Sequence, residues 1–255
     1  MIYIAAHKRF TDIGLKNYMP LQVGAYKKDS LGYLRDDSGD SISFKNSNYC
    51  ELTGLYWIWK NTSDDYKGLV HYRRYFGKSN LSSSVNKIYL YDELINMLEC
   101  VDIILPYVER FKQNSKDELL ISCCTPEIFE ELRSIVLSLY PDYIDCFDNF
   151  FSDNKASLFN MMFCRKDLFD SYCHWLFDIL FELDNKIDLS GLNQYQQRLF
   201  GFLSERLLNI WVMKNNLKAI NLPVIATELK PIERIRLIRR RYTNNICFKL
   251  NRENN

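Results

Sequence analysis

The stretch GLVHYRRYF at residues 68–76 holds the densest group of side chains that can do chemistry in this sequence. Three apolar or small residues end a short predicted strand, and His71, Tyr72, Arg73 and Arg74 follow in immediate succession. Two adjacent guanidinium groups offer planar forks that suit phosphate oxygens and need no protonation near pH 7. The same pattern fits arginines paired with surface carboxylates and tyrosines that cover the end of a sheet. Both interpretations are open on these nine residues alone.

A first strand is predicted at Ile2–Ala6, and it too ends where polar chemistry begins. Its last residues, Ala5 and Ala6, are small, and His7 and Lys8 come directly after them. In an open α/β sheet, ligands bind beyond the carboxyl ends of the strands. The arrangement therefore fits a strand that delivers its backbone to a nucleotide, and it equally fits a plain strand end with solvated charges.

Two carboxylates and one amide are further candidates. The spacing of apolar residues predicts a helix from Asn48, as its cap, to Lys60. Glu51 lies in its first turn, where it either complements the helix dipole or holds a ribose or sugar hydroxyl. Asn160 interrupts a predicted buried strand at residues 157–164, where it satisfies backbone groups at a kink or faces an acceptor sugar. Glu205, inside a predicted late helix, lies on a solvated face, forms an ion pair with its neighbour Arg206, or is a catalytic carboxylate.

These residues require a scaffold of alternating strands and helices. Further helices are predicted at 92–100, 125–140, 166–183 and 194–214, and further strands at 101–105 and 217–227. Residues 27–48 are rich in Asp, Ser, Gly and Asn and predict a long loop of the kind that covers a substrate. The expected fold is α/β, with a central, mostly parallel sheet flanked by helices.

Composition narrows the classes of function. With 255 residues of which 47% are hydrophobic, the chain can bury a sizeable core. Its eight cysteines form no CxxC pair and its three histidines lie far apart, so no zinc site is predicted and most thiols are read as small apolar residues of a reducing cytoplasm. We expect neither a secretory signal nor a membrane-spanning segment.

Charge is unevenly placed along the chain. Residues 230–255 hold eight Lys or Arg against two acids, although the whole chain carries a formal net charge of only +1. In ERIRLIRRRY, isoleucine and leucine alternate with arginine, as on a short amphipathic helix that lies on anionic lipid. We therefore predict one domain at 1–229 and a basic helical tail at 230–255. A nucleic-acid interpretation of the tail is weaker, because the preceding body is acidic.

Several stretches together resemble one protein family. They are IYIAAHK, GDSISFKNSNYCELTGLYWIWKN, DYKGLVHYRRYF, DIILP, LFNMMFCRKDLFDSYCHWLFDILFEL and YQQRLFGFLSERLLNIWV, in this order over residues 1 to about 222. The sequence resembles the bacterial capsule and O-antigen glycosyltransferases of the DUF4422 family, which include galactofuranosyltransferases. The strings NYCELTGLYWIWKN and HYRRYF carry most of the specificity.

The resemblance implies a GT-A-like fold and an inverting glycosyltransferase that uses a UDP-sugar, with galactofuranose as the best expected sugar. It also implies a glycan acceptor, often lipid-linked, at the inner face of the cytoplasmic membrane. The tail at 230–252 would bind this membrane surface, so that the protein is peripheral to it. Nucleic acid is not an expected partner. On this basis Ala5, Ala6, His7, Glu51, His71, Tyr72, Arg73 and Arg74 are assigned to the donor, and Asn160 to the acceptor.

Most GT-A enzymes hold the diphosphate through a divalent ion bound by an Asp-x-Asp motif, and this sequence contains no such motif. We expect Arg73 and Arg74, with His71, to neutralise the leaving diphosphate without a metal or other cofactor. Glu205 is the first candidate for the catalytic base. The chain departs from its relatives between residues 111 and 129, where it has no histidine; Asp117 or Glu118 would substitute on the acceptor side.

A non-catalytic function competes with the enzyme. The chain would then be a scaffold subunit of a polysaccharide assembly complex that kept the nucleotide-sugar-binding fold and lost the base. Slow hydrolysis of the donor without acceptor is expected of the enzyme and not of the scaffold.

Overall fold

The computed structural model describes residues 1–79, 84–229, 232–233, 235–236 and 239. The strands among them are β1 (Ile2–Ala6), β2 (Tyr18–Gln22), β3 (Leu34–Arg35), β4 (Tyr66–His71), β5 (Arg74–Phe76), β6 (Ile103–Pro106), β7 (Val108–Arg110), β8 (Lys155–Ser157), β9 (Met162–Arg165), β10 (Ala219–Leu222) and β11 (Val224–Ala226). The α-helices are α1 (Asn46–Tyr49), α2 (Leu52–Asn61), α3 (Tyr91–Met97), α4 (Ser115–Ser122), α5 (Pro126–Leu139), α6 (Ile144–Ser152), α7 (Lys166–Lys186) and α8 (Leu199–Lys214).

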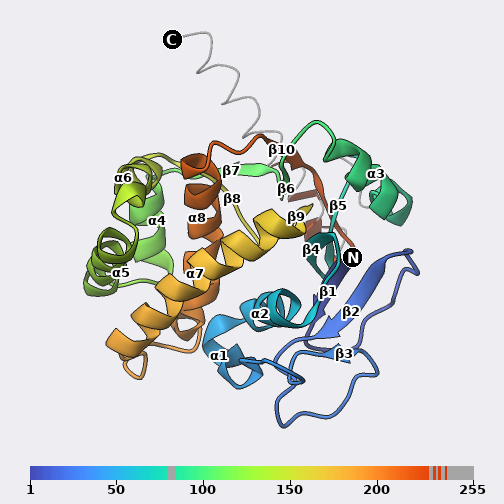
Figure 1. Cartoon of the computed structure of the whole chain (residues 1–255), viewed down its shortest axis with the longest axis horizontal. Helices are drawn as coiled ribbons and strands as arrows, with labels where there is room; N and C mark the ends of the chain where they lie inside the picture. Colours follow the sequence, from blue (N-terminus) through green and yellow to red (C-terminus); the bar gives the residue numbers. More distant parts are fainter. Residues whose placement is uncertain (80–83, 230–231, 234, 237–238, 240–255) are drawn as a thin grey trace.

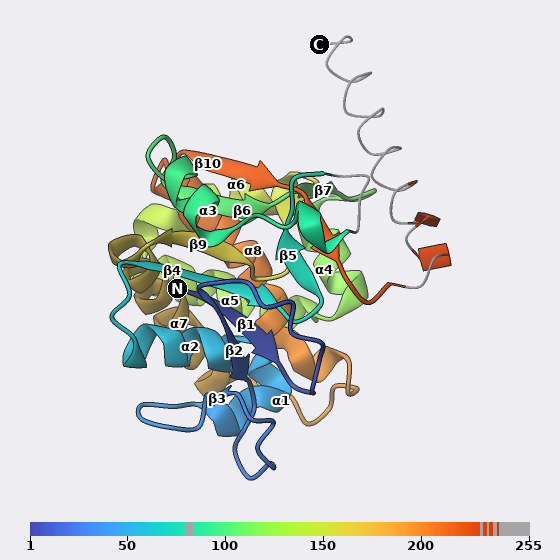
Figure 2. The same ribbon diagram turned by 90° about the vertical axis from the view of Figure 1, so that its right-hand side faces the viewer.

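One mixed sheet organises the chain. Its order is β10-β6-β9-β4-β1-β2-β3, which Figure 2 shows from top to bottom. β1 is parallel to β2 and β4, and β10 is parallel to β6, whereas β9 runs antiparallel between β4 and β6. β5 and β11 form an antiparallel extension beyond β4. The predicted α/β fold with a mostly parallel, helix-flanked sheet is confirmed.

Both faces of the sheet are covered, because alternate side chains of a strand point to opposite faces. In β1, Tyr3 and Ala5 pack into the core beneath α2, α5, α7 and α8, whereas Ile4 and Ala6 pack into a smaller core with α3. Figure 1 shows α4, α5 and α6 on the side of the molecule away from β1 and β2, with α7 and α8 between. A strand buried on both faces explains the unbroken apolar run IYIAA.

Three predicted elements were wrong in their continuity. The strand expected at 217–227 is two strands, β10 and β11, which pair with β6 and β5 respectively. The helix expected from Asn48 to Lys60 is broken at Cys50, which has a φ of 52°, so Asn48 lies inside α1 and caps nothing. The strand expected at 157–164 is two strands, β8 and β9, joined by a turn. Where local signals were complete, as for Thr125, whose hydroxyl caps α5 ahead of a proline, the prediction is confirmed.

The loop at residues 27–48 is tied down by one buried carboxylate. Asp36 is fully buried and accepts hydrogen bonds from the backbone N–H groups of Gly24 and Ala25 and from the hydroxyls of Ser43 and Thr53. These bonds hold the loop against the end of β2 and against α2. The loop thereby fixes one border of the sheet edge on which the candidate site lies.

The predicted basic tail at 230–255 lies outside the described residues, apart from the few positions beyond 231 given above. The domain boundary at residue 229 and the membrane-binding helix stay predictions. No helix in the described part of the chain combines the length and apolarity needed to cross a bilayer.

Candidate functional site

The carboxyl ends of β1 and β4 meet at one edge of the sheet. The strands are parallel, and Ala5 pairs with His71 in their register. His7, directly after β1, therefore lies against Tyr72, directly after β4, with ring centroids 5.3 Å apart in an edge-on arrangement. The ammonium of Lys8 lies 5.2 Å from the centre of the same tyrosine ring. Two segments far apart in the sequence thus form one surface.

This surface is electropositive. Partial burial lowers the pKa of His7, and the positive charges of Lys8 and Arg73, followed by Lys28 and Arg198, lower it further. A lowered pKa favours the neutral form of this imidazole at pH 7. A concentration of one sign of charge raises the local concentration of oppositely charged ligands. The edge therefore suits an anionic ligand, with Lys8 also paired to Glu228 at 3.3 Å.

The two adjacent arginines have different surroundings. Arg73 is exposed, and its guanidinium carbon lies 5.6 Å from the centre of the Tyr72 ring. Arg74 is half-buried, and its guanidinium carbon lies 4.7 Å from the centre of the Phe159 ring. Among the described residues, neither guanidinium forms an ion pair with a carboxylate. Arg73 thus belongs to the surface around His7, and Arg74 to the interior beside the turn between β8 and β9.

That turn is strained. Phe159 and Asn160 have φ values of 79° and 51°, so two consecutive residues other than glycine occupy the left-handed region. Such a conformation costs of order 1–3 kcal/mol per residue and persists only where the surroundings enforce it. Strain of this kind collects at functional sites. The turn is therefore a candidate for part of the functional site.

Four side chains from three separate segments hold the turn. His71 Nε2 donates to the carbonyl of Phe159 at 2.5 Å, and the Phe159 N–H donates to Glu205 Oε1 at 2.8 Å. The amide of Asn160 donates to Glu51 Oε1 at 2.8 Å. The hydroxyl of Ser204 donates to Asn160 Oδ1 at 2.8 Å. The structure therefore brings together His71, Glu51, Asn160 and Glu205, which were predicted separately.

Glu205 is the carboxylate with the properties of a base. Burial raises its pKa to about 7 and the nearby charge of Glu51 adds to the rise, while Arg206, the Phe159 N–H and Arg74 oppose it. Arg206 pairs with Glu205 Oε2 at 2.9 Å, so the predicted ion pair is present. A carboxylate with a pKa near the working pH can both accept and release a proton. The ion pair and a catalytic role are compatible.

Asp117 and Glu118 lie elsewhere. Both are in the first turn of α4, where acidic residues complement the helix dipole. Asp117 exchanges hydrogen bonds with Asn114, whose side chain caps the helix. In the described part of the chain, neither carboxylate forms a hydrogen bond or ion pair with the residues around the Phe159 turn. The structure does not bring them together with the other predicted residues.

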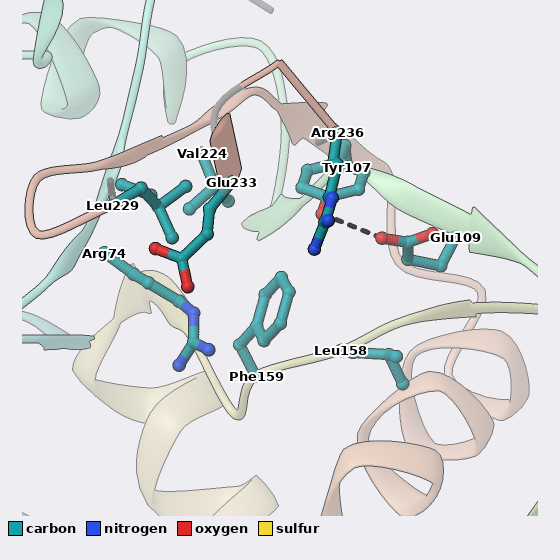
Figure 3. Close-up of a pocket in the computed structure, with 10 residues that line it drawn as sticks. Arg74, Tyr107, Glu109, Leu158, Phe159, Val224, Leu229, Glu233 and Arg236 are labelled. Atoms are coloured by element: carbon teal, nitrogen blue, oxygen red, sulfur yellow. Dashed lines mark hydrogen bonds between the residues drawn. The ribbon is translucent and has the colours of Figure 1, made fainter. Parts of the chain in front are cut away.

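A cavity of about 410 Å³ opens beside the strained turn (Figure 3). Arg74 and Phe159 lie at one side of it, and Tyr107 and Glu109 lie opposite. Its other lining residues are Leu158, Val224, Ala226, Leu229, Glu233 and Arg236. Arg74 and Phe159 therefore connect the cavity to the residues that surround Glu205.

Comparison with known proteins identifies the family. The model of a domain of unknown function, DUF4422, matches residues 1–216. The chain belongs to the DUF4422 family. Among solved structures, the DUF4422 chain is similar to the WbbM bifunctional glycosyltransferase, with 30% sequence identity and a TM-score of 0.83. The match covers 89% of this chain and 45% of WbbM, so the chain spans about half the length of that protein. No curated protein matches it.

Sequence reasoning missed three residues of this DUF4422 site. Tyr107 and Glu109 come two and four residues after the predicted strand at 101–105, at the end of a strand where an α/β sheet favours ligand contact. Arg198 occupies the N-cap position of α8 without a side-chain capping bond, and it donates from Nε to Cys50 Sγ at 3.3 Å. A cation at a helix N-terminus opposes the helix dipole. That mismatch was the available signal that Arg198 serves something other than the helix.

The described residues of the DUF4422 chain contain no group of three or more His, Cys, Asp or Glu side chains that could hold a metal ion. The edge at His7 instead presents Lys8, Arg73 and Arg198.

Proposed function

We propose that this chain is a glycosyltransferase that moves a sugar from a nucleotide sugar to a hydroxyl of a glycan acceptor. One observation carries the proposal: Glu205 of α8, a carboxylate with a pKa of about 7, is hydrogen-bonded to a strained turn that lies next to an electropositive sheet edge. Membership of the DUF4422 family and the similarity to a glycosyltransferase over 89% of the chain support it.

The donor would lie along the edge formed by β1 and β4. The backbone at Ala5 and Ala6 would face the nucleoside, and Arg73 with Arg198 would receive the diphosphate beside His7. Arg74, between this edge and the cavity, would face the bond that breaks. The family resemblance favours UDP-galactofuranose as the donor.

The chemistry follows from these positions. The acceptor oxygen attacks the anomeric carbon and inverts it, while the bond from that carbon to the diphosphate oxygen breaks. Glu205 takes the proton of the acceptor hydroxyl, and the diphosphate leaves with the bonding electrons. Fixed cations stabilise the charge that develops on the leaving group, which is the largest single contribution in many such reactions.

We infer that this transfer needs no divalent metal, because the arginines supply the positive charge that a metal would supply. Full activity in excess chelator is the expected result. Loss of activity in chelator and its recovery with manganese would contradict the inference.

The central test removes the base and keeps its shape. Glu205→Gln should reduce transfer by 10²–10⁴-fold, the range for general bases, and leave UDP binding by calorimetry nearly unchanged. Glu118→Gln, which alters one of the two acidic residues predicted on the acceptor side, is the matched control and should transfer at the wild-type rate. A wild-type protein that binds UDP-sugars but neither hydrolyses nor transfers them would instead be the non-catalytic scaffold. Equal loss in both variants would remove Glu205 from its role.

The acceptor's location is also a proposal. A lipid-linked glycan at the inner face of the cytoplasmic membrane would suit the basic tail at 230–252. Co-sedimentation of the whole chain with phosphatidylglycerol vesicles, but not with phosphatidylcholine vesicles, is expected. Equal binding to both would refute an electrostatic membrane contact.

A further inference from the structure

One aromatic ring at the sheet edge gathers three basic side chains around it. Tyr72, directly after β4, is only 6% exposed. The centre of its ring lies 5.3 Å from the centroid of the His7 ring and 5.2 Å from Lys8 Nζ. The guanidinium carbon of Arg73 lies 5.6 Å from the same centre. His7 thus belongs to a cluster that also holds two cationic side chains.

The imidazole of His7 has unused hydrogen-bonding capacity. The residue is exposed, and in the part of the chain that the structure describes neither ring nitrogen forms a hydrogen bond or an ion pair. A neutral imidazole offers one donor and one acceptor, whereas its protonated form offers two donors. Both nitrogens are therefore available to a ligand that approaches the edge.

The surroundings of His7 disfavour its protonated form while no ligand is bound. Partial burial lowers its pKa, and four positive charges lower it further. These charges belong to Lys8, Arg73, Lys28 and Arg198, which follow β1, β4 and β2 and begin α8. Glu228 compensates Lys8 in part, at 3.3 Å, but Arg73 forms no ion pair with a described carboxylate. The lowered pKa favours the neutral imidazole at pH 7.

A diphosphate at this edge would reverse the balance of charge around the imidazole. An opposite charge within about 4–6 Å favours the charged form of a titratable group. His7 would then gain a proton from the solvent and donate from its ring nitrogens to phosphate oxygens. Arg73 and Arg198, which the proposed function assigns to the same diphosphate, would act beside it.

We propose that His7 binds the diphosphate of the donor directly and takes up a proton as it does so, which couples donor binding to proton uptake. The inference rests on the proposed function and adds to it a binding residue whose positive charge is present only with the ligand. Because the bound state holds more protons, affinity for the donor should rise as pH falls. Transfer by Glu205 should respond to pH in the opposite direction, and at saturating donor only that response is seen.

Calorimetry of UDP binding to the full chain at pH 7 measures this coupling. Titrations in PIPES, MOPS and Tris buffers, which differ in ionisation enthalpy, give the number of protons taken up for each UDP bound. The wild type should take up about half a proton or more, since a nearby opposite charge favours the protonated imidazole about tenfold or more. Uridine, which lacks the diphosphate, should cause no proton uptake.

His7→Gln keeps a polar side chain and removes the titration. Its proton uptake on binding UDP should fall to near zero. The terminal phosphate of UDP itself titrates near pH 6, so the wild type is compared with this variant at each pH. From pH 8.5 to pH 6.5, the wild type should gain about threefold or more in affinity relative to His7→Gln.

Two further variants serve as matched controls. Glu205→Gln removes the other group that titrates near pH 7, and His174→Gln removes a histidine of α7 whose side chain is 68% exposed. Both should keep the wild-type proton uptake. Uptake that persists in His7→Gln, that disappears in Glu205→Gln, that uridine also causes, or that the wild type lacks would overturn this inference alone. A wild-type chain that neither binds UDP nor hydrolyses any UDP-sugar would overturn the proposed function, and this inference with it.

Discussion

The titration of Glu205 is the sharpest test of the site, because it affects both activity and stability. Burial raises the pKa of this carboxyl from 4.5 to about 7. If Glu205 is the base, transfer requires its ionised form. With a pKa of about 7, about a tenth of the enzyme is active at pH 6 and about nine tenths at pH 8. The initial rate should therefore rise with pH through a midpoint near 7.

Stability should change in the opposite direction. The folded state holds the Glu205 proton more tightly than the unfolded state, so the stability gained from this proton is present below pH 4.5 and is lost as pH rises through 7. Linkage between pKa values of 4.5 and about 7 makes this loss about 2.5 kcal/mol between pH 5 and pH 8. Glu205→Gln has no such proton. The variant's free energy of unfolding, relative to wild type, should therefore rise by this amount over the same interval.

Urea unfolding followed by tryptophan fluorescence at pH 5, 6, 7 and 8 measures this difference. Glu205→Gln also leaves Arg206 without its carboxylate partner, which changes the free energy of unfolding by an amount that should be similar at each pH. Only the pH dependence of the difference between variant and wild type is therefore used. Glu130→Gln, which changes a carboxylate whose side chain is 61% exposed, should keep the wild-type dependence. A flat difference between Glu205→Gln and wild type, or an activity midpoint near pH 4.5, would refute the argument that burial tunes this group.

Three further outcomes follow from the contacts around the site. Arg73→Gln and Arg198→Gln should each weaken UDP binding about tenfold, with calorimetry as the measurement and a smaller loss at high salt, since these cations act on the diphosphate. Asp36→Asn should lower the free energy of unfolding, measured in urea, by about 3 kcal/mol. The buried carboxylate accepts four hydrogen bonds, and the amide NH₂ of asparagine would be a donor facing other donors. Asn160→Ala should cost about 2 kcal/mol and reduce transfer, and a variant with wild-type stability and rate would show that the turn needs no such support.

Much of the scaffold was predictable because its signals are local. β1 is an unbroken apolar run, and α5 begins with a capping threonine and a proline. The break in the helix at Cys50 has no such signal: no glycine or proline lies there, and the apolar spacing continues across it. Its cause is tertiary, since Asn46 donates to the Cys50 carbonyl and to Thr53 and so holds the break. Local propensity is overridden by such contacts.

The candidate site was predictable as residues but not as geometry. Two neighbouring arginines suggested one paired fork, yet Arg73 lies in the turn after β4 and Arg74 begins β5, so the two guanidiniums lie beside different aromatic rings. Tyr107 and Glu109 were overlooked because the segment after residue 106 shows no period. What joins these positions is the sheet register, which a sequence window does not contain.

The strained turn explains why residues far apart in the sequence form one site. Glu51 and Asn160 are 109 positions apart, and His71 and Phe159 are 88 apart, yet each pair is joined by a hydrogen bond. Relaxing the turn into a regular strand would leave His71, Glu205 and the amide of Asn160 without these partners in a largely dry interior, at a cost of about 1–3 kcal/mol for each buried group. Summed over three groups, this cost of about 3–9 kcal/mol is comparable to or larger than the strain of two left-handed residues, about 2–6 kcal/mol. The hydrogen bonds of His71, Glu205 and Asn160 therefore stabilise the turn. The turn, for its part, fixes the position of Glu205 relative to the cavity.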